Sequence, residues 1–127
     1  MTLKVIDISS HQSVEQAGMD GIDGVIVKAT QDVTYINPKC DPQYQLAKSK
    51  GRLLGVYHYA GGGDPVAEAD FFLKNIEGYI HEAVLALDWE AGQNASWGDS
   101  SWCRRFVNRV HEKTGVWCLI YVQASAV

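Results

Sequence analysis

Residues 83–90 read AVLALDWE, an apolar run that ends in two carboxylates separated by one residue. The run has the length and composition of a buried strand. Side chains alternate across a strand, so Asp88 and Glu90 are expected to face the same way, within several ångströms of each other. One acid and one base could then act on a single bond. The alternative is a strand end that turns into solvent, where acidic side chains are common.

The same pattern, an apolar strand that ends in a polar residue, recurs along the chain. Strands are predicted at residues 4–8, 24–30, 53–60, 83–90 and 116–122. Helices are predicted at residues 38–50, 65–79 and 100–114, with a short helix or turn at 13–17. Nearly continuous apolar strands that alternate with helices are typical of a parallel sheet covered by helices.

Proline and glycine mark the ends of the predicted helices. Pro38 suits the first turn of one helix, and Gly51 ends it. Asp64 is predicted to cap the next helix, with Pro65 in its first turn. Gly115 is the expected C-cap of the third helix.

Polar residues stand at or near the carboxyl ends of the predicted strands. They are Asp7, Lys28, His58, Asp88, Glu90 and Tyr121. In a parallel α/β barrel or open sheet, these strand ends form the face that carries the chemistry. No glycine-rich fingerprint follows the first strand, which argues against a nucleotide site.

Composition limits the possible partners. The chain has 127 residues, 46% of them hydrophobic and 20% charged, which indicates one globular domain. A formal charge of −4 argues against nucleic acid or an anionic membrane as the main partner.

No apolar stretch reaches the roughly 18 residues of a membrane span, and no signal peptide is indicated, so synthesis in the cytoplasm is expected. The three cysteines are widely spaced, without a metal motif, and are expected to be buried thiols; no metal or cofactor is implied.

Four segments together resemble the glycoside hydrolase family 25 muramidases, the Chalaropsis-type lysozymes that many bacteriophages use as endolysins. They are VIDISSHQ (5–12), VIVKAT (25–30), GVYHYA (55–60) and LDWE (87–90). The resemblance covers essentially the whole chain. It implies a TIM-like parallel β/α barrel of five βα units and three further strands, which cleaves the β-1,4 bond between N-acetylmuramic acid and N-acetylglucosamine in bacterial peptidoglycan.

By the same resemblance, Glu90 is the general acid, and Asp7 and Asp88 are supporting carboxylates. Lys28, His58 and Tyr121 fall on positions near the sugar. Tyr59 is expected among the sugar-stacking aromatic side chains of the cleft, although Tyr57, Tyr59, Trp89 and Trp117 are expected mostly to pack against helices.

Two departures from the family pattern stand out. The family commonly has an acidic residue after the Lys-Ala-Thr triplet, where this chain has Gln31. The sequence also stops after the fifth strand, without the last three strands and a further site aspartate that they usually carry. The chain is therefore expected to be the N-terminal part of a single catalytic domain, completed by a missing C-terminal segment or a second chain.

The chemistry leaves alternatives open. Burial and a like-charged neighbour would both help Glu90 to keep its proton. A 2-acetamido sugar permits substrate assistance, in which the acetamide oxygen attacks the anomeric carbon and Asp88 stabilises the amide nitrogen. The alternative is inversion, in which Asp88 or Asp7 activates a water molecule. The sequence alone does not decide between these routes.

Each site residue also has a structural alternative. Asp7 could cap the turn that follows it, and Lys28 could neutralise the acidic cluster. His58 could be a core histidine with satisfied hydrogen bonds. The basic run of Arg104, Arg105, Arg109 and Lys113 is expected to be a solvated helix face. Two rivals to the enzyme are a non-catalytic peptidoglycan-binding fragment and an assembly subunit.

Overall fold

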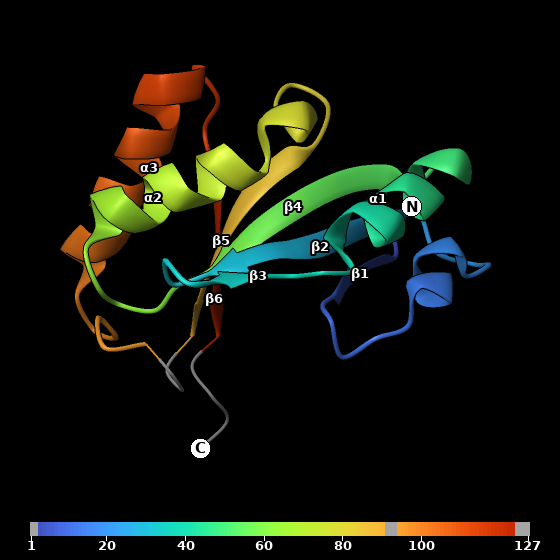
Figure 1. Ribbon diagram of the computed structural model, residues 1–127, viewed down its shortest axis with the longest axis horizontal. Helices are drawn as coiled ribbons and strands as arrows, with labels where there is room; N and C mark the ends of the chain where they lie inside the picture. The colour runs from blue at the N-terminus through green and yellow to red at the C-terminus, as the bar shows by residue number, and fades with distance from the viewer. Residues whose placement is uncertain (1–2, 91–93, 124–127) are drawn as a thin grey trace.

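The computed structural model describes residues 3–90 and 94–123. The chain forms a curled parallel sheet with helices on its outer face, which is half of a β/α barrel (Figure 1). The strands lie side by side in the order β1-β2-β4-β5-β6, and each neighbouring pair is parallel. Their bounds are Val5–Ile8 (β1), Gly24–Gln31 (β2), Leu53–Tyr59 (β4), Val84–Glu90 (β5) and Leu119–Gln123 (β6). This arrangement confirms the predicted fold class.

Helices link the strands on the outer face of the sheet (Figure 1). The α-helices are α1 (Cys40–Ser49), α2 (Pro65–Asn75) and α3 (Ser100–Thr114), and the 3-10 helices are η1 (Val14–Gly18) and η2 (Glu77–Tyr79). Across the described part of the chain, none of the helices has the length and hydropathy that spanning a bilayer requires.

Two of the helix ends form as the sequence predicts. Asp64 caps α2 by accepting a hydrogen bond from the Val66 N–H, and Pro65 occupies the first turn, where its missing N–H has no consequence. α3 ends at Thr114 because Gly115 adopts the left-handed conformation, with φ of 76°.

Other boundaries differ from the prediction. α1 begins at Cys40, so the proline in its first turn is Pro42 and not Pro38. α2 ends at Asn75, and η2 follows it as a separate turn. The predicted loop at residues 31–37 contains a short strand, β3 (Tyr35–Ile36), which pairs antiparallel with the end of β2.

The last strand starts at Leu119, three residues later than predicted. The apolar residues 116–118 continue the strand pattern, but the Val116 N–H donates to the Thr114 hydroxyl oxygen at 3.0 Å. That bond holds Val116 in the turn after the helix, so its amide does not enter the sheet.

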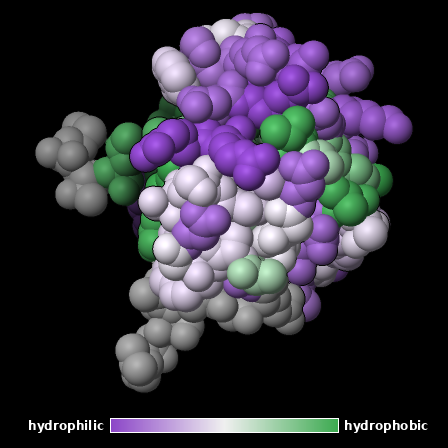
Figure 2. Space-filling model, turned by 90° about the vertical axis from the view of Figure 1, so that its left-hand side faces the viewer, coloured by the Kyte–Doolittle hydropathy of each residue, from purple (hydrophilic) through white to green (hydrophobic). Residues whose placement is uncertain are grey.

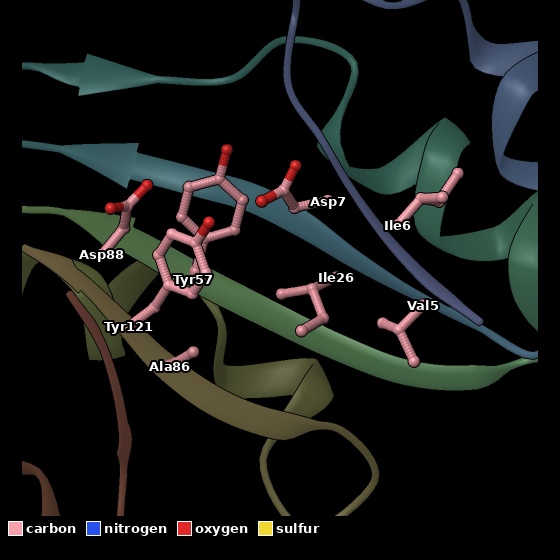
Figure 3. A pocket seen from close by; sticks show the side chains of 8 residues that line it. All are labelled: Val5, Ile6, Asp7, Ile26, Tyr57, Ala86, Asp88 and Tyr121. Atoms are coloured by element: carbon pink, nitrogen blue, oxygen red, sulfur yellow. The ribbon is translucent and has the colours of Figure 1, made fainter. Parts of the chain in front are cut away.

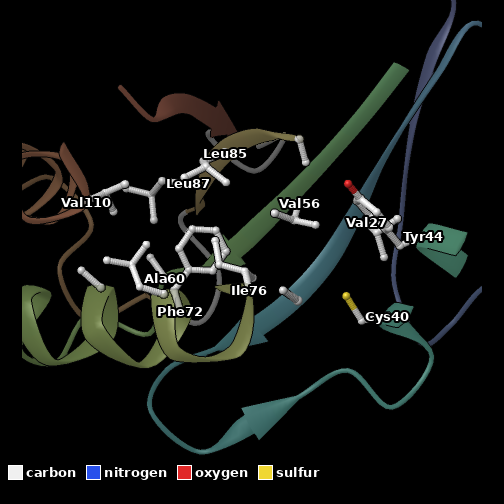
Figure 4. Close-up of a cluster of buried hydrophobic side chains, with 14 of the residues drawn as sticks. Val27, Cys40, Tyr44, Val56, Ala60, Phe72, Ile76, Leu85, Leu87 and Val110 are labelled. Carbon is white, nitrogen blue, oxygen red and sulfur yellow. The ribbon is translucent and has the colours of Figure 1, made fainter. Parts of the chain in front are cut away.

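The hydrophobic core lies between the sheet and the helices (Figure 4). Strand side chains such as Val27, Val56 and Leu87 meet Phe72 of α2 and Val110 of α3, and all five are fully buried. Burying a side chain of this size stabilises the fold by about 1.5–3 kcal/mol. The core therefore fixes which side of each strand faces the helices, and the alternate residues face the opposite, concave side.

The outward face of α3 carries the basic run and is hydrophilic. Arg104 and Arg105 are exposed, while Arg109 forms an ion pair with Asp70 of α2 at 2.8 Å. Hydrophilic side chains gather over the upper part of this side of the molecule, where α3 lies (Figure 2). The prediction of a solvated helix face is confirmed.

The edge strand β6 is apolar and exposed on both faces. Leu119 and Tyr121 on one face are 59% and 49% exposed, and Ile120 and Val122 on the other are 44% and 57% exposed. An edge strand that offers both unpaired backbone groups and apolar side chains invites pairing with further strands. Covering these side chains would add about 25 cal/mol per Å² of apolar area.

We expect the 127-residue chain alone to self-associate through β6 and not to remain a stable, active monomer. Ile120→Lys should raise the monomer fraction, because a charge on an edge strand opposes pairing. Leu53→Lys is the matched control, since Leu53 is 58% exposed but lies on β4, inside the sheet. Light scattering and thermal unfolding measure the outcome. A monodisperse, cooperatively folded and fully active wild-type monomer would contradict this expectation.

Candidate active site

The concave side of the sheet encloses a hollow of about 260 Å³. The hollow is lined by Val5, Ile6, Asp7, Ile26, Tyr57, Ala86, Asp88 and Tyr121. The oxygen atoms of Asp7, Tyr57, Asp88 and Tyr121 gather toward one end, and Val5, Ile26 and Ala86 line the rest (Figure 3). The polar end lies toward the carboxyl ends of the strands, as expected for a site built on a parallel sheet.

Asp88 and Glu90 share the concave face of β5, because they lie two residues apart on one strand. The two side chains lie close enough to interact, because Glu90 helps to raise the pKa of the Asp88 carboxyl. The predicted pairing of these side chains on one face is therefore present.

Asp88 is the more buried partner, with only 7% of its surface exposed. Burial raises the pKa of its carboxyl to about 8, helped by the neighbouring carboxyl group of Glu90 and the charge of Asp7, and opposed by Lys28. Its Oδ1 atom is buried and has no hydrogen-bond partner among the described residues. A buried oxygen of this kind is a candidate to bind a substrate N–H or O–H group.

Asp7 faces the pair from β1 and is exposed at the rim of the hollow. Tyr57, on β4, lines the same hollow, and the pKa of its hydroxyl is raised by burial and by the charges of Asp7, Asp88 and Glu90. Tyr57 was expected to pack against helices, and this expectation is wrong. The register of the sheet places it there, since Tyr57 pairs with Ala86, two residues before Asp88, and the sequence alone does not give that register.

Lys28 brings positive charge to the same side of the sheet. Its ammonium group donates to Gln31 Oε1 at 2.6 Å and lies over the rings of Tyr35 and Tyr59, 5.2 and 4.8 Å from their centroids. Partial burial lowers the pKa of Lys28, and the charges of Asp88 and Glu90 oppose that shift. Gln31, which stands where the family commonly has an acid, therefore holds the lysine with a neutral group.

A register shift in β2 makes the contact between Lys28 and Gln31 possible. The pairing with β4 is irregular between Lys28 and Thr30, so the alternation of side chains changes at Ala29. Thr30 turns to the helix side, where it bonds His58, and Gln31 returns to the concave side beside Lys28.

His58 does not lie in the hollow, so its expected position near the sugar is wrong. It is fully buried on the helix side of β4, between Phe72 and Phe106, with ring centroids 5.8 and 5.2 Å away. Its neighbours in the sequence, Tyr57 and Tyr59, face the concave side because side chains alternate along the strand. The alternative of a core histidine with satisfied hydrogen bonds is the one that the structure supports.

Two tryptophans lie away from the hollow. Trp89 is buried, contacts the tilted ring of Trp97 with 4.7 Å between ring centroids, and donates its Nε1–H to the Ser96 hydroxyl. Trp117 is 62% exposed and stacks on His111 at 3.8 Å.

The cysteines are buried or partly buried thiols, as predicted. Within residues 3–90 and 94–123, no group of three or more potential metal ligands comes together.

Comparison with known proteins shows the family of the chain. The model of glycosyl hydrolases family 25 matches residues 6–126. The chain belongs to glycosyl hydrolases family 25. A relative, the N,O-diacetylmuramidase of Chalaropsis sp., is 33% identical over 142 residues, covering 98% of this chain and 67% of that protein. The resemblance inferred from the four segments is confirmed.

Solved structures from the family share the fold. The family GH25 lysozyme from Aspergillus fumigatus has a TM-score of 0.81 and 32% identity, covering 94% of this chain and 65% of that one. The modular Cpl-1 endolysin, solved with a peptidoglycan analogue, has a TM-score of 0.73 and 26% identity, covering 93% and 35%. The family 25 chain described here thus spans about two thirds or less of the length of these proteins.

We expect Asp88→Asn to stabilise the protein at alkaline pH. Folding raises the pKa of Asp88 from 3.8 to about 8, so the carboxyl contributes stability below pH 3.8 that is lost as the pH rises through 8. The amide keeps the shape of the side chain but never carries the buried charge. Thermal unfolding should show a melting temperature higher by about 3 °C or more at pH 8.5, and little change at pH 4.

Asp20→Asn is the control, because Asp20 is exposed and far from β5 in the sequence. It should leave the melting temperature unchanged at both pH values. An Asp88→Asn variant that is less stable than wild type at pH 8.5 would contradict the assigned burial of the Asp88 charge.

Proposed function

We propose that this chain carries the carboxylate site of a peptidoglycan muramidase that acts at the bacterial cell wall. Asp88 and Glu90 share one face of β5, and Asp88 and Asp7 line the polar end of the hollow; this grouping of carboxylates is the observation that carries the proposal. The bond cleaved is the β-1,4 bond between N-acetylmuramic acid and N-acetylglucosamine. The name of the Chalaropsis relative and the peptidoglycan analogue bound to the Cpl-1 endolysin support this substrate.

Glu90 is proposed as the general acid. It ends β5 and is less buried than Asp88, so it lies where a leaving oxygen can reach it. In this role it donates its proton to the glycosidic oxygen as the bond to the leaving sugar breaks.

Asp88 is proposed to steady the substrate's acetamide group. Once the proton has moved to the leaving oxygen, the Asp88 carboxylate can accept the acetamide N–H, and its unpartnered Oδ1 is free for that bond. The acetamide oxygen then attacks the anomeric carbon.

Asp7 is proposed to stabilise the positive charge that develops at the anomeric carbon. Alternatively, it activates the water that completes hydrolysis. It lines the hollow from β1, on the other side from β5, and its charge acts on Asp88. An activated water on that side would face the sugar from the direction opposite to Glu90.

Substrate contacts are assigned to the residues around the carboxylates. Lys28 can donate to sugar oxygens while Gln31 holds its ammonium group. Tyr59 lies near Glu90 and Asp88, whose charges add to the effect of burial in raising the pKa of its hydroxyl group, and Tyr121 offers an exposed ring at the edge of the hollow. Aromatic faces next to polar groups suit a pyranose ring.

A second candidate is a peptidoglycan-binding subunit that needs another chain or segment to become active. The exposed apolar edge β6 is the observation that favours it. Binding to purified walls without release of soluble fragments, at every pH tested, would select this candidate over the enzyme.

We predict that Glu90→Gln lowers lysis at least about 10²- to 10⁴-fold in any form of the protein that lyses cell walls. The amide keeps the size of the side chain but cannot donate the proton. The measurement is the loss of turbidity of a cell-wall suspension.

Glu77→Gln is the matched control, since Glu77 is exposed in η2 on the helix side of the sheet. It should lyse walls as wild type does. Near-normal lysis by Glu90→Gln would overturn the assignment of the acid.

A further inference from the structure

A chain of buried polar side chains lies behind the carboxylate site. Thr30, His58 and Glu68 are each 0% exposed, although they come from β2, β4 and α2. His58 Nδ1 lies 2.7 Å from the Thr30 hydroxyl, and His58 Nε2 lies 2.8 Å from Glu68 Oε1. The three residues therefore link two strands and a helix through the core.

The proton positions in this chain follow from its partners. Burial lowers the pKa of His58, which favours the neutral ring. Glu68 accepts hydrogen bonds from its other partners, so the ring proton is assigned to Nε2, facing Glu68. Nδ1 then accepts the Thr30 hydroxyl proton. All three side chains have their hydrogen bonds satisfied in one arrangement.

Glu68 also holds the loop that follows β4. Its Oε1 accepts the Gly61 N–H and its Oε2 accepts the Gly63 N–H, both at 2.9 Å. We call residues 61–63 the glycine loop. A single buried carboxyl group thus accepts two loop amides and the His58 ring, and the loop has no freedom to move without breaking buried bonds.

The glycine loop is packed against the segment that follows β5. The Ala95 N–H donates to the Gly61 carbonyl oxygen at 3.3 Å. Gly62 has φ of 88°, and a Cβ atom there would lie 2.4 Å from the Ala95 nitrogen and 2.5 Å from the Ser96 nitrogen. Only glycine permits this approach. Trp102 of α3 completes the contact by donating to the Gly63 carbonyl at 2.7 Å.

This arrangement reaches the carboxylate pair directly. The residue before the glycine loop, Ala60, donates its N–H to the Asp88 carbonyl oxygen at 2.9 Å. Tyr59, one residue earlier, lies near Glu90 and Asp88, whose charges add to the effect of burial in raising the pKa of its hydroxyl group. A shift of the glycine loop would therefore move the ends of both β4 and β5.

The buried polar chain makes the core less stable than apolar side chains of similar volume would at the same place. His58 is surrounded by Phe72 and Phe106, and apolar side chains of similar volume would pack there without desolvating a carboxyl group. What apolar side chains could not supply is the set of bonds to the Gly61 and Gly63 amides.

We propose that Thr30, His58 and Glu68 are positioning residues, which lock the glycine loop against residues 94–97 and thereby hold Asp88 and Glu90 in their working arrangement. Their effect on catalysis rests on the proposed function. Their effect on the loop and on Asp88 does not, so the two are tested separately.

The first measurement is amide hydrogen exchange at Gly61 and Gly63, followed by NMR. Glu68→Gln keeps the shape of the side chain but turns one acceptor into a donor. Exchange at these amides should become at least about tenfold faster, because one buried N–H loses its acceptor. Val110→Ala is the control: it opens a cavity in α3 and lowers global stability, so it should speed exchange across the core without singling out the loop.

The second measurement is the NMR titration of Asp88. A loosened loop admits water, and since burial is the largest cause of the raised pKa of Asp88, that pKa should fall toward 3.8 in Glu68→Gln. It should stay unchanged in Val110→Ala. Lysis is measured in any form of the protein that lyses walls, and Glu68→Gln is compared with Val110→Ala at equal melting temperature. Glu68→Gln should have a maximal rate about tenfold below that of Val110→Ala. The amount of wall that gives half the maximal rate should be unchanged.

A milder pair of variants covers the case in which Glu68→Gln does not fold. Thr30→Val removes the hydroxyl group at nearly constant shape, and Thr30→Ser retains it. Thr30→Val should speed exchange at Gly61 and Gly63, and Thr30→Ser should restore wild-type exchange.

Loop exchange and an Asp88 titration that change no more than in Val110→Ala would overturn the proposal and leave the polar chain a stability element only. Absence of lysis by the wild type in every form would instead contradict the proposed function, and exchange and titration would still decide the role of Glu68.

Discussion

Alternation of side chains along parallel strands is the constraint on which this structure depends. Each strand contributes side chains to both faces of the sheet. When one residue faces the helices, the residues before and after it face the concave side. On β5 this rule sends Leu85, Leu87 and Trp89 to the core and leaves Asp88 and Glu90 together on the concave face, where Asp88 lines the hollow. The apolar packing that stabilises the sheet is thus also what places two acidic groups side by side.

The site holds a proton because the fold places negative charge where water has little access. Asp88 is nearly fully buried beside Glu90, with Asp7 across the hollow and Lys28 as the opposing charge. Each of these features costs folding free energy, which the core behind the sheet offsets. The stabilising core therefore lies on one face of the sheet and the carboxylates lie on the other. The polar chain through His58 and Glu68 links the two.

The sequence predicts most of the fold and the carboxylates, because those depend on local patterns. The positions of Asp7, Asp88 and Glu90 follow from strand runs and a two-residue spacing. His58 could not be placed in the same way: all three residues of Tyr57-His58-Tyr59 tolerate either face, and only packing against Phe72 and Phe106 decides. The irregularity at Ala29, which brings Gln31 beside Lys28, depends on pairing with another strand and leaves no mark in the sequence.

The central claim is that this carboxylate site cleaves the glycan on the reducing side of N-acetylmuramic acid. The direct measurement is to digest purified peptidoglycan, reduce the products with borohydride and identify the new reducing ends by mass spectrometry. The account predicts N-acetylmuramitol ends. Products that carry N-acetylglucosaminitol ends, or fragments released by cleavage of the peptide with the glycan intact, would contradict it.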